Sequence, residues 1–411
     1  MIDLKKFRLD KTLLIVMLVL MAGYHFFVYF NAPWEIYYDS IHQIRNNNLI
    51  VIGCSFFAFF AMFILVAYLL FMKRYPIKIL IPIMILFLFG VFWVAYIVVV
   101  DNVSVTLLLR DSFPPFSLIA AGIILIGYED KWWEIIKKAL LIISIVFSLY
   151  SFGEIILAFY RFGFNYRITY GAPMYLYIIG LFATYAVVTI TDDWIKNRKL
   201  ILLLVVVLLF FNSAILQGRS WFLQTTILFI IYIIRIRNFY SYDRGLRMFI
   251  PFSIFLVTVI IFVSNIELFE GLIHRFSTSG DTRTYQLETF FEQVSFDRLL
   301  IGGGTKAGYL FNDDPNFHFV DNQVILYMFR YGIIPTIAYL FLIFYPIYKV
   351  FMIKNKLLMR KSFVLISWFA AMMGISVYFN ITFGMAHMIV MLCTGRLFYE
   401  IINYKKVYGG E

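Results

Sequence analysis

Long apolar segments alternate with short polar segments along most of the chain. A helix needs roughly 17–25 mostly apolar residues to cross the hydrocarbon core of a bilayer, and about twelve segments approach or reach that length. They lie near residues 12–30, 49–72, 77–100, 113–127, 136–159, 170–190, 199–216, 220–236, 248–264, 322–348, 362–380 and 385–402. Because their apolar residues are continuous and do not alternate with polar ones, the pattern predicts an all-α polytopic membrane protein with about twelve transmembrane helices.

One long polar stretch, residues 265–320, lies between the ninth and tenth of these segments. It contains two of the five histidines, several arginines, a triple glycine and an acidic pair. The apolar side chains that recur at helical spacing within it are Leu287, Phe290, Phe291 and Val294. This spacing predicts an amphipathic helix on the membrane surface. We expect one integral membrane domain over residues 1–411, in which residues 265–320 form a loop that carries short amphipathic helices.

Composition and charge agree with a membrane protein. The chain is 62% hydrophobic and 14% charged, with a mean hydropathy of +0.85. Both cysteines, Cys54 and Cys393, fall within predicted spans, so we expect no disulfide framework. Lysine and arginine concentrate in alternate loops that include both termini, and the positive-inside rule places those loops in the cytoplasm and residues 265–320 outside. Topology thus accounts for the formal net charge of +11 without a nucleic-acid partner.

The two predicted faces differ in the kind of cation they carry. The cytoplasmic loops are rich in lysine, whereas the basic residues assigned to the outside are Arg45, Arg110, Arg161, Arg167, Arg219, Arg275, Arg283, Arg298, Lys306 and Arg330. Topology alone accepts either residue. A guanidinium group binds phosphate oxygens bidentately and is more weakly hydrated than an ammonium group. The outer face therefore suits a phosphate or pyrophosphate at the membrane surface; the alternative is that these arginines only reach toward lipid headgroups.

Two arginines and two glycines are candidates for binding that anion. Arg219 lies in a short turn before a span, where the N–H groups of a helix N-terminus favour anions; an interface anchor is the alternative. Arg283 shares the apolar face of the predicted amphipathic helix, where a cation needs either a carboxylate or a ligand. Gly303 and Gly304 belong to the triple glycine and can form an N–H nest for an anion, although a flexible turn has the same composition.

Candidates for acid–base chemistry lie just before the tenth span. The ordinary pKa of a histidine side chain, roughly 6.5, suits His318 to act as a general base or acid near neutral pH, although a packed interfacial histidine is the alternative. Asp321 and Asn322 can orient His318 or cap the helix that follows. His387, near the outer end of the last span, is a supporting candidate. No histidine and carboxylate pattern has the spacing of a known metal site, and we expect neither a metal nor another cofactor.

Three short motifs follow one another on the predicted outer side. They are Gln217-Gly-Arg-Ser220, then Asp281-Thr-Arg283 with Ile301-Gly-Gly-Gly304, and then His318-Phe-Val-Asp-Asn322 before Tyr331-Gly332. This ordered set resembles the O-antigen polymerase and O-antigen ligase superfamily of bacterial envelope glycosyltransferases. The topology covers the whole chain, but the motifs lie only between about residues 212 and 335. The ligases commonly carry a His-x-His-Asn-like cluster, and the single His318 with Asp321 and Asn322 is more similar to the repeat-unit polymerases.

The resemblance implies a polymerase of O-antigen, capsule or exopolysaccharide repeat units in the bacterial inner membrane. Both termini would be cytoplasmic and the active site would lie on the outer face. Donor and acceptor would be oligosaccharides linked to undecaprenyl pyrophosphate, and a chain-length regulator is a further candidate partner. In this interpretation Arg219 and Arg283 bind the pyrophosphate of the donor. His318 accepts the proton of the acceptor hydroxyl in an inverting, metal-independent transfer.

The remaining candidate residues would complete the substrate site. Gly303, Gly304, Asp321 and Asn322 are assigned to substrate binding, and Tyr285 and Tyr309 offer faces on which sugars can stack, although interfacial packing is the commoner role of such residues. Three alternative functions stay open. A ligase would move the finished glycan to a lipid or protein acceptor. A flippase or exporter would only bind and move it, which the scarcity of ionisable residues within the spans disfavours. A scaffold would leave the external arginines unexplained.

Overall fold

The computed structural model describes most of the chain. The described residues are 2–30, 49–100, 102, 115–162, 172–191, 199–216, 219–239, 282–304, 307–318, 320, 322–374 and 384–408. They divide into two compact units, one formed by Met1–Ala139 with Thr282–Glu411 and the other by Leu140–Asp281. We call these unit 1 and unit 2.

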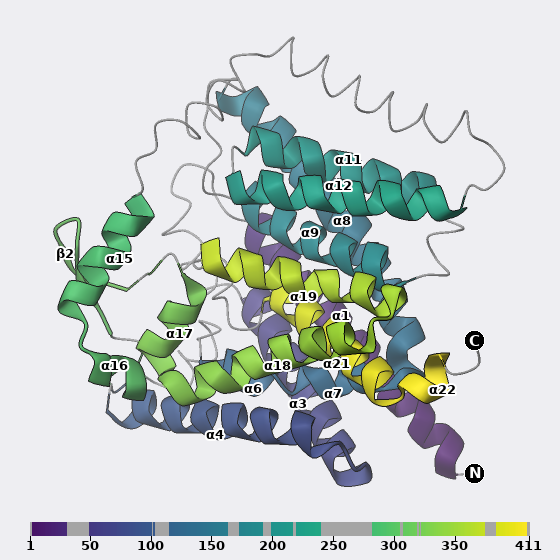
Figure 1. The fold of residues 1–411 in the computed structure, drawn as a ribbon, viewed down its shortest axis with the longest axis horizontal. Helices are drawn as coiled ribbons and strands as arrows, with labels where there is room; N and C mark the ends of the chain where they lie inside the picture. The colour runs from purple at the N-terminus through teal and green to yellow at the C-terminus, as the bar shows by residue number, and fades with distance from the viewer. Residues whose placement is uncertain are drawn as a thin grey trace. The chain divides into compact units, whose positions relative to one another are not determined.

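Unit 1 holds most of the helices and the one hairpin seen in the described residues (Figure 1). Its elements before unit 2 are α1 (Ile2–Phe30), α3 (Leu49–Met72), α4 (Ile77–Val99), α6 (Pro115–Ala120), α7 (Ile123–Tyr128) and the start of α8 (Asp130–Phe162). Its later elements are α15 (Thr282–Gln293), α16 (Phe296–Ile301), β1 (Tyr309–Phe311), β2 (Asp314–Phe317), α17 (Gln323–Tyr331), α18 (Ile333–Ile353), α19 (Lys356–Gly374), α21 (Met385–Ile402) and α22 (Tyr404–Tyr408).

Unit 2 consists of the remainder of α8 with α9 (Ala172–Ile190), α11 (Lys199–Ile215) and α12 (Arg219–Phe239). Its helices are apolar but are joined by hydroxyl groups. The Ser144 and Thr184 hydroxyl oxygens lie 2.7 Å apart, and those of Ser213 and Thr225 lie 2.8 Å apart. Hydrogen bonds of this kind hold helices together where hydrophobic burial gives no preference for protein over lipid.

Six helices among the described residues are long and apolar enough to cross a membrane. They are Asp10–Phe27, Leu49–Met72, Ile77–Val99, Asp130–Ala158, Ile333–Ile353 and Met385–Ile402. Many of their exposed side chains are large and apolar, such as Phe57 at 58% and Leu88 at 60% exposure. A surface of that kind is stable against lipid and unfavourable against water. The chain is thus an all-α, polytopic, membrane-embedded protein, as the apolar pattern predicts at this level.

Two of the predicted continuous spans are interrupted. Residues 322–348 form two helices, because α17 ends before Gly332, which has φ of 90°. A Cβ at Gly332 would lie 2.6 Å from the Ile301 carbonyl oxygen, so only glycine fits this close approach. Residues 113–127 are likewise divided into α6 and α7. The span predicted at 248–264 lies outside the described residues.

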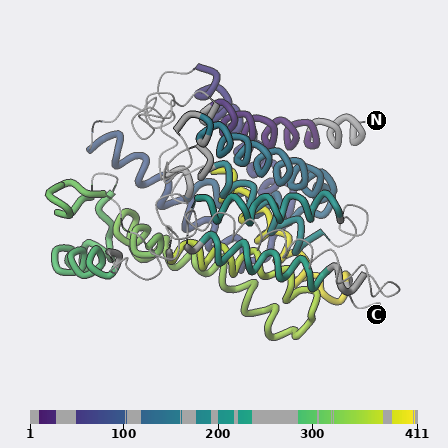
Figure 2. Tube along the Cα trace, turned by 90° about the horizontal axis from the view of Figure 1, so that it is seen from above, coloured from purple at the N-terminus to yellow at the C-terminus, as the bar shows by residue number. Residues whose placement is uncertain are grey.

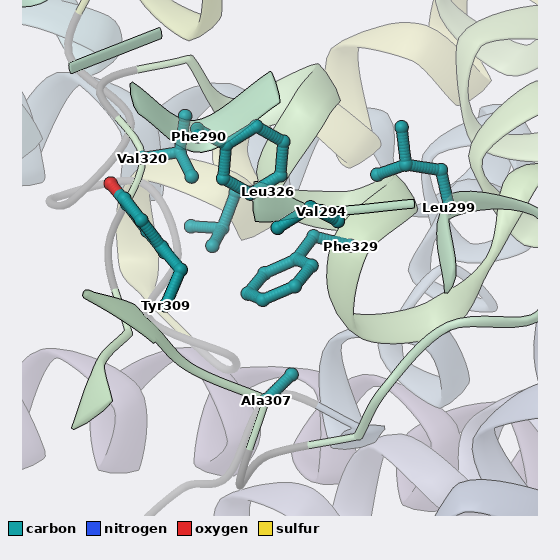
Figure 3. Packing of buried hydrophobic residues seen from close by; sticks show 8 residues of the cluster. All are labelled: Phe290, Val294, Leu299, Ala307, Tyr309, Val320, Leu326 and Phe329. Atoms are coloured by element: carbon teal, nitrogen blue, oxygen red, sulfur yellow. The ribbon is translucent and has the colours of Figure 1, made fainter. Parts of the chain in front are cut away.

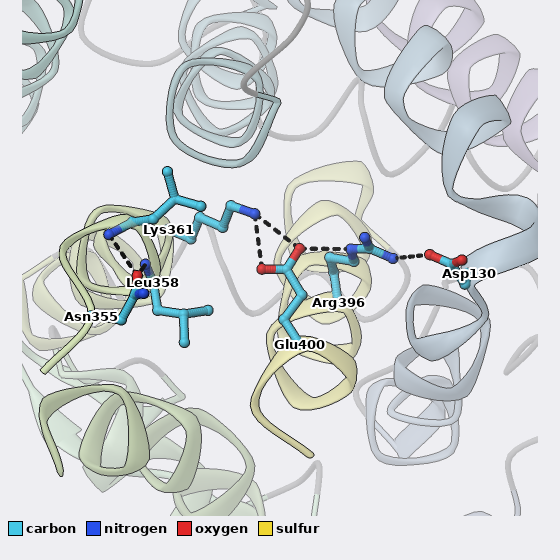
Figure 4. Close-up of polar contacts among 7 residues, drawn as sticks. Asp130, Asn355, Leu358, Lys361, Arg396 and Glu400 are labelled. Atoms are coloured by element: carbon cyan, nitrogen blue, oxygen red, sulfur yellow. Dashed lines mark hydrogen bonds and ion pairs between the residues drawn. The ribbon is translucent and has the colours of Figure 1, made fainter. Parts of the chain in front are cut away.

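One end of unit 1 is held by a network of ion pairs around the buried Glu400 carboxylate (Figure 4). The Lys361 ammonium donates to both carboxylate oxygens of Glu400 at 3.0 and 2.8 Å. Arg396 joins the same carboxylate to Asp130, with Nε 2.9 Å from Glu400 Oε1 and Nη1 2.6 Å from Asp130 Oδ1. This network ties α8, α19 and α21 together close to α22.

A second polar contact involves the segment between α3 and α4. Lys73 and the Tyr75 hydroxyl both donate to the Glu129 carboxylate, the hydroxyl at 2.8 Å. Burial and the neighbouring Glu129 charge raise the pKa of Tyr75, so its hydroxyl stays protonated and remains a donor. The buried Glu129 carboxylate therefore has both a cationic and a hydroxyl partner.

The polar loop elements lie at the opposite end of unit 1. In Figure 1 the beginning of α1 and helix α22 lie on the right, whereas α15, α16 and the hairpin lie on the left. Figure 2 shows these loop elements, in green, again at the left. Helix α17 leads from these loop elements to α18, which packs along α4. The long spans α4 and α18 therefore carry the candidate site at one end of unit 1.

Candidate functional site

A β-hairpin that the sequence analysis did not predict leads the chain to His318. Strands β1 and β2 pair antiparallel. Asn312 and Asp313 connect them with φ of 50° and 64°, a left-handed conformation that asparagine and aspartate tolerate better than most residues. An Asn-Asp pair between two short segments with aromatic residues was the available sequence signal. Of the acidic pair noted in the sequence, Asp313 lies in this turn and Asp314 begins β2.

A hydrophobic cluster packs the hairpin onto α15, α16 and α17 (Figure 3). Its buried residues are Phe290, Val294, Leu299, Ala307, Tyr309, Val320, Leu326 and Phe329. The ring of Phe290 stands edge-on to those of Tyr309 and Phe329, with centroids 5.1 Å apart in each pair. The predicted amphipathic helix is present as α15. The prediction that the apolar face of this helix lies on the membrane is wrong for Phe290 and Val294, because both pack against protein. Phe291 is 52% exposed.

The triple glycine docks on the C-terminal end of α17. Gly303 donates its N–H to the Phe329 carbonyl at 2.8 Å, and Gly304 donates to the Arg330 carbonyl at 2.9 Å. These carbonyls are among those that a helix end leaves without an internal partner. The anion nest predicted at Gly303 and Gly304 is therefore wrong, because both N–H groups are already bonded. Gly302 and Gly304 have φ of 90° and 72°, which explains the choice of glycine.

His318 is half-buried and its ring is oriented by a backbone carbonyl. Its Nδ1 lies 2.9 Å from the carbonyl oxygen of Ala307. A carbonyl oxygen only accepts, so Nδ1 carries the hydrogen, and Nε2 of the neutral ring is then the basic nitrogen. This arrangement gives His318 a fixed tautomer with one nitrogen available as a proton acceptor.

The Arg330 side chain contacts the segment that carries His318. Arg330 was placed among the outer basic residues in the sequence analysis but was given no role of its own. Its side chain is 7% exposed, and Nη2 donates to the His318 carbonyl oxygen at 3.2 Å. It comes from the last turn of α17. A basic residue close to the Tyr331-Gly332 pair was visible in the sequence, but its partner was not, because that partner is a peptide carbonyl.

Asn322 caps helix α17, which confirms one of the two roles predicted for it. Its Oδ1 accepts hydrogen bonds from the N–H groups of Val324 at 3.0 Å and Ile325 at 3.2 Å. The next residue, Gln323, is fully buried, and its amide has no hydrogen-bond partner among the described residues. Asp321 lies outside the described residues.

The two candidate arginines are placed only by their backbones. Arg219 is the first residue of α12, which covers the predicted residues 220–236 but is not among the six candidate spans, and it belongs to unit 2. Arg283 is the second residue of α15 in unit 1. Their side chains lie outside the described part of the chain, so their roles in anion binding stay predictions.

The two candidate tyrosines differ. Tyr309 is 4% exposed and stands between Phe290 and Phe317 in the hydrophobic cluster. The prediction that Tyr309 offers a face to sugars is therefore wrong in this structure. Tyr285 is 60% exposed, and its ring centroid lies 5.9 Å from that of Phe311 on the hairpin. Tyr285 keeps the exposed surface that sugar stacking requires.

The start of α21 contains His387 and contacts His25 of α1. The Met385 N–H donates to His25 Nε2 at 2.9 Å, which joins α21 to α1. His387 is 3% exposed and stacks on Tyr339, with ring centroids 5.7 Å apart. His25 had no supporting pattern in the sequence, because its partner is a backbone N–H far along the chain.

Among the described residues, no three histidine, cysteine or carboxylate side chains gather to hold a metal ion. Comparisons with protein-family models, with curated proteins and with solved structures found no match. The candidate site thus rests on its own geometry: a half-buried histidine of defined tautomer at the end of two membrane spans, held by a glycine segment, a hairpin and a buried arginine.

Proposed function

We propose that this protein is a polysaccharide repeat-unit polymerase of the bacterial inner membrane. It would transfer a growing glycan from undecaprenyl pyrophosphate to another lipid-linked repeat unit on the outer face of the membrane. The observation that carries the proposal is the Nδ1 contact of His318, because it leaves Nε2 as a proton acceptor at one end of the spans α4 and α18. A general base at that position suits a reaction between two substrates that are both anchored in the bilayer.

The proposed reaction breaks one bond and forms one. The acceptor hydroxyl oxygen attacks the anomeric carbon of the donor sugar from the side opposite the pyrophosphate. The bond from that carbon to the phosphate oxygen breaks, and undecaprenyl pyrophosphate leaves with the electron pair. His318 Nε2 takes the hydroxyl proton and later releases it to water. The anomeric configuration is inverted, and no nucleotide sugar is consumed.

Arginines serve the leaving group in this proposal. Negative charge develops on the pyrophosphate as the bond breaks, and Arg219 and Arg283 would stabilise it with their planar guanidinium groups. The start of α15 and the start of α12 are each helix N-termini, which also favour an anion. Tyr285 would stack on a sugar of the substrate.

The arrangement of unit 1 supports the proposed orientation. Helix α22 and the beginning of α1 lie at the end opposite the hairpin and α16 (Figure 1). An inside position for both termini then leaves the loop elements outside, in agreement with the lysine-rich and arginine-rich faces of the sequence. In this proposal the substrate, His318 and Arg283 would meet at headgroup level.

The test is the profile of lipid-linked glycans in cells that lack the native gene. Wild type, Arg283→Lys and His318→Ala are compared at equal membrane levels, with Arg298→Lys as the control because Arg298 is exposed on α16 in the same loop. We expect only single lipid-linked repeats in Arg283→Lys and His318→Ala, and normal chains in wild type and in Arg298→Lys. The loss in Arg283→Lys would show that fork geometry matters beyond charge.

Other outcomes contradict the proposal. Long chains that stay on the carrier in these variants would identify a ligase. Lipid-linked repeats confined to the inner leaflet would identify an exporter. Normal chains in both variants would show that neither residue belongs to the site.

A further inference from the structure

The contacts around His318 close into a ring of hydrogen bonds. Ala307 accepts from His318 Nδ1 at 2.9 Å and donates its own N–H to the Gly304 carbonyl at 3.4 Å. Gly304 donates its N–H to the Arg330 carbonyl at 2.9 Å. Arg330 Nη2 donates to the His318 carbonyl at 3.2 Å and completes the circuit. Four residues from three segments of the chain thus hold one imidazole.

Arg330 is the member of this ring whose side chain makes the closing bond. Its backbone carbonyl fixes the glycine segment, and its guanidinium group fixes the segment that carries His318. All four acceptors in the ring are backbone carbonyls, which no side-chain substitution removes, whereas the Arg330 guanidinium is a side-chain donor. Because the Arg330 side chain is 7% exposed, water cannot easily replace its hydrogen bond.

The ring defines which nitrogen of His318 is basic. Free neutral imidazole has two tautomers, and the hydrogen bond at one nitrogen selects between them. The Ala307 carbonyl can select the Nδ1–H form only while the His318 imidazole stays within hydrogen-bond distance of it. The hydrogen bond from Arg330 to the His318 carbonyl holds the His318 backbone in that position. Loss of the closing bond would free the histidine segment to move away from Ala307.

We propose that Arg330 is a positioning residue that sets the tautomer of His318 through this ring. Its chemical consequence rests on the proposed function, since a base presents Nε2 to the acceptor hydroxyl only in the Nδ1–H form. Arg330 itself touches no substrate in this proposal. It acts by holding the His318 backbone against the glycine segment.

The test measures the tautomer directly by magnetic resonance of the full-length protein with isotope-labelled histidine in lipid vesicles. The chain has five histidines, and His318→Gln assigns the signal by its disappearance. We expect the Nδ1–H form for His318 in wild type and a mixture or the Nε2–H form in Arg330→Lys and Arg330→Gln. Arg298→Lys, an exposed arginine in the same loop, should leave the signal unchanged.

Turnover with lipid-linked repeats is measured on the same samples. We expect kcat to fall about 10-fold or more in Arg330→Lys, the equivalent of roughly 1.4 kcal/mol, with a smaller change in KM. An unchanged tautomer in both Arg330 variants would overturn the inference. A changed tautomer without any loss of turnover would support the role of Arg330 in setting the tautomer. It would, however, remove His318 from the proposed reaction.

Discussion

The two ends of unit 1 are held together by different chemistry. At the α22 end, Lys361 and Arg396 share the Glu400 carboxylate, and Arg396 continues to Asp130. At the loop end, the His318 ring donates to a carbonyl, and that carbonyl belongs to a chain of peptide groups. Ion pairs fix the first end, whereas backbone geometry fixes the second.

These two kinds of contact, ion pairs and hydrogen bonds to carbonyls, favour different properties at the two ends of unit 1. An ion pair orients two side chains, but it also settles their charge, which suits a permanent contact between helices. A carbonyl carries no net charge of its own, so it orients the imidazole through one ring nitrogen and leaves the other nitrogen available for proton transfer. The α22 end is therefore suited to stability and the loop end to chemistry. Substitutions should separate the two properties.

The largest effect is expected from Glu400→Gln. This change leaves Lys361 and Arg396 buried beside a neutral amide, and breaking a buried ion pair in this way costs about 3–5 kcal/mol. The melting temperature of the purified protein in detergent should fall strongly. The control is Glu134→Gln, because Glu134 is 66% exposed and its pair with Lys137 lies on one helix surface, where pairs contribute little. Equal melting temperatures for the two variants would contradict the proposed division between the ends.

A smaller effect is expected from Gly332→Ala, which acts on the geometry that supports the loop end. The added methyl group would meet the Ile301 carbonyl at 2.6 Å and require φ of 90° from alanine, a strain of about 1–3 kcal/mol. We expect a lower melting temperature together with lost turnover, since the glycine segment is displaced. Gly153→Ala is the matched control, because nothing lies within 4 Å of its added methyl group. A Gly332→Ala protein with an unchanged melting temperature and unchanged turnover in the proposed reaction would show that the break between α17 and α18 is not needed.

The smallest effect, and the only one of opposite sign, is expected from Gln323→Met. The Gln323 amide is fully buried without a partner among the described residues, and replacing such a group by an apolar one of similar shape should stabilise the protein by about 1 kcal/mol. Thermal melting in detergent checks the sign. A lower melting temperature would reveal a hydrogen bond to this amide. Raised stability with reduced turnover would give the amide a place in substrate binding.

The apolar pattern predicted the long helices α3 and α4 because a span must be long and continuously apolar. Helices α3 and α4 fall close to the predicted residues 49–72 and 77–100. Asn322 was also predictable as a cap, since its side chain bonds within three residues along the chain. Such features depend on local sequence, and local sequence determines them.

The predictions that failed depend on contacts between distant residues. The break at Gly332 exists because the Ile301 carbonyl approaches it, and hydropathy cannot register that approach. Tyr309 looked like an exposed aromatic residue in a polar loop, but the hairpin turns it into the core beside Phe290. The composition of the triple glycine predicts that Gly303 and Gly304 donate to an anion, whereas the end of α17 supplies their acceptors.

The acceptor of the His318 ring has a consequence for how this architecture changes in evolution. A peptide carbonyl is present in every amino acid, so position 307 can exchange its side chain for another small one and still orient the imidazole. Related chains would then keep the function without keeping a recognisable partner for the histidine. The lasting marks would be the residues that the backbone path demands, which are the glycines of positive φ at 302, 304 and 332.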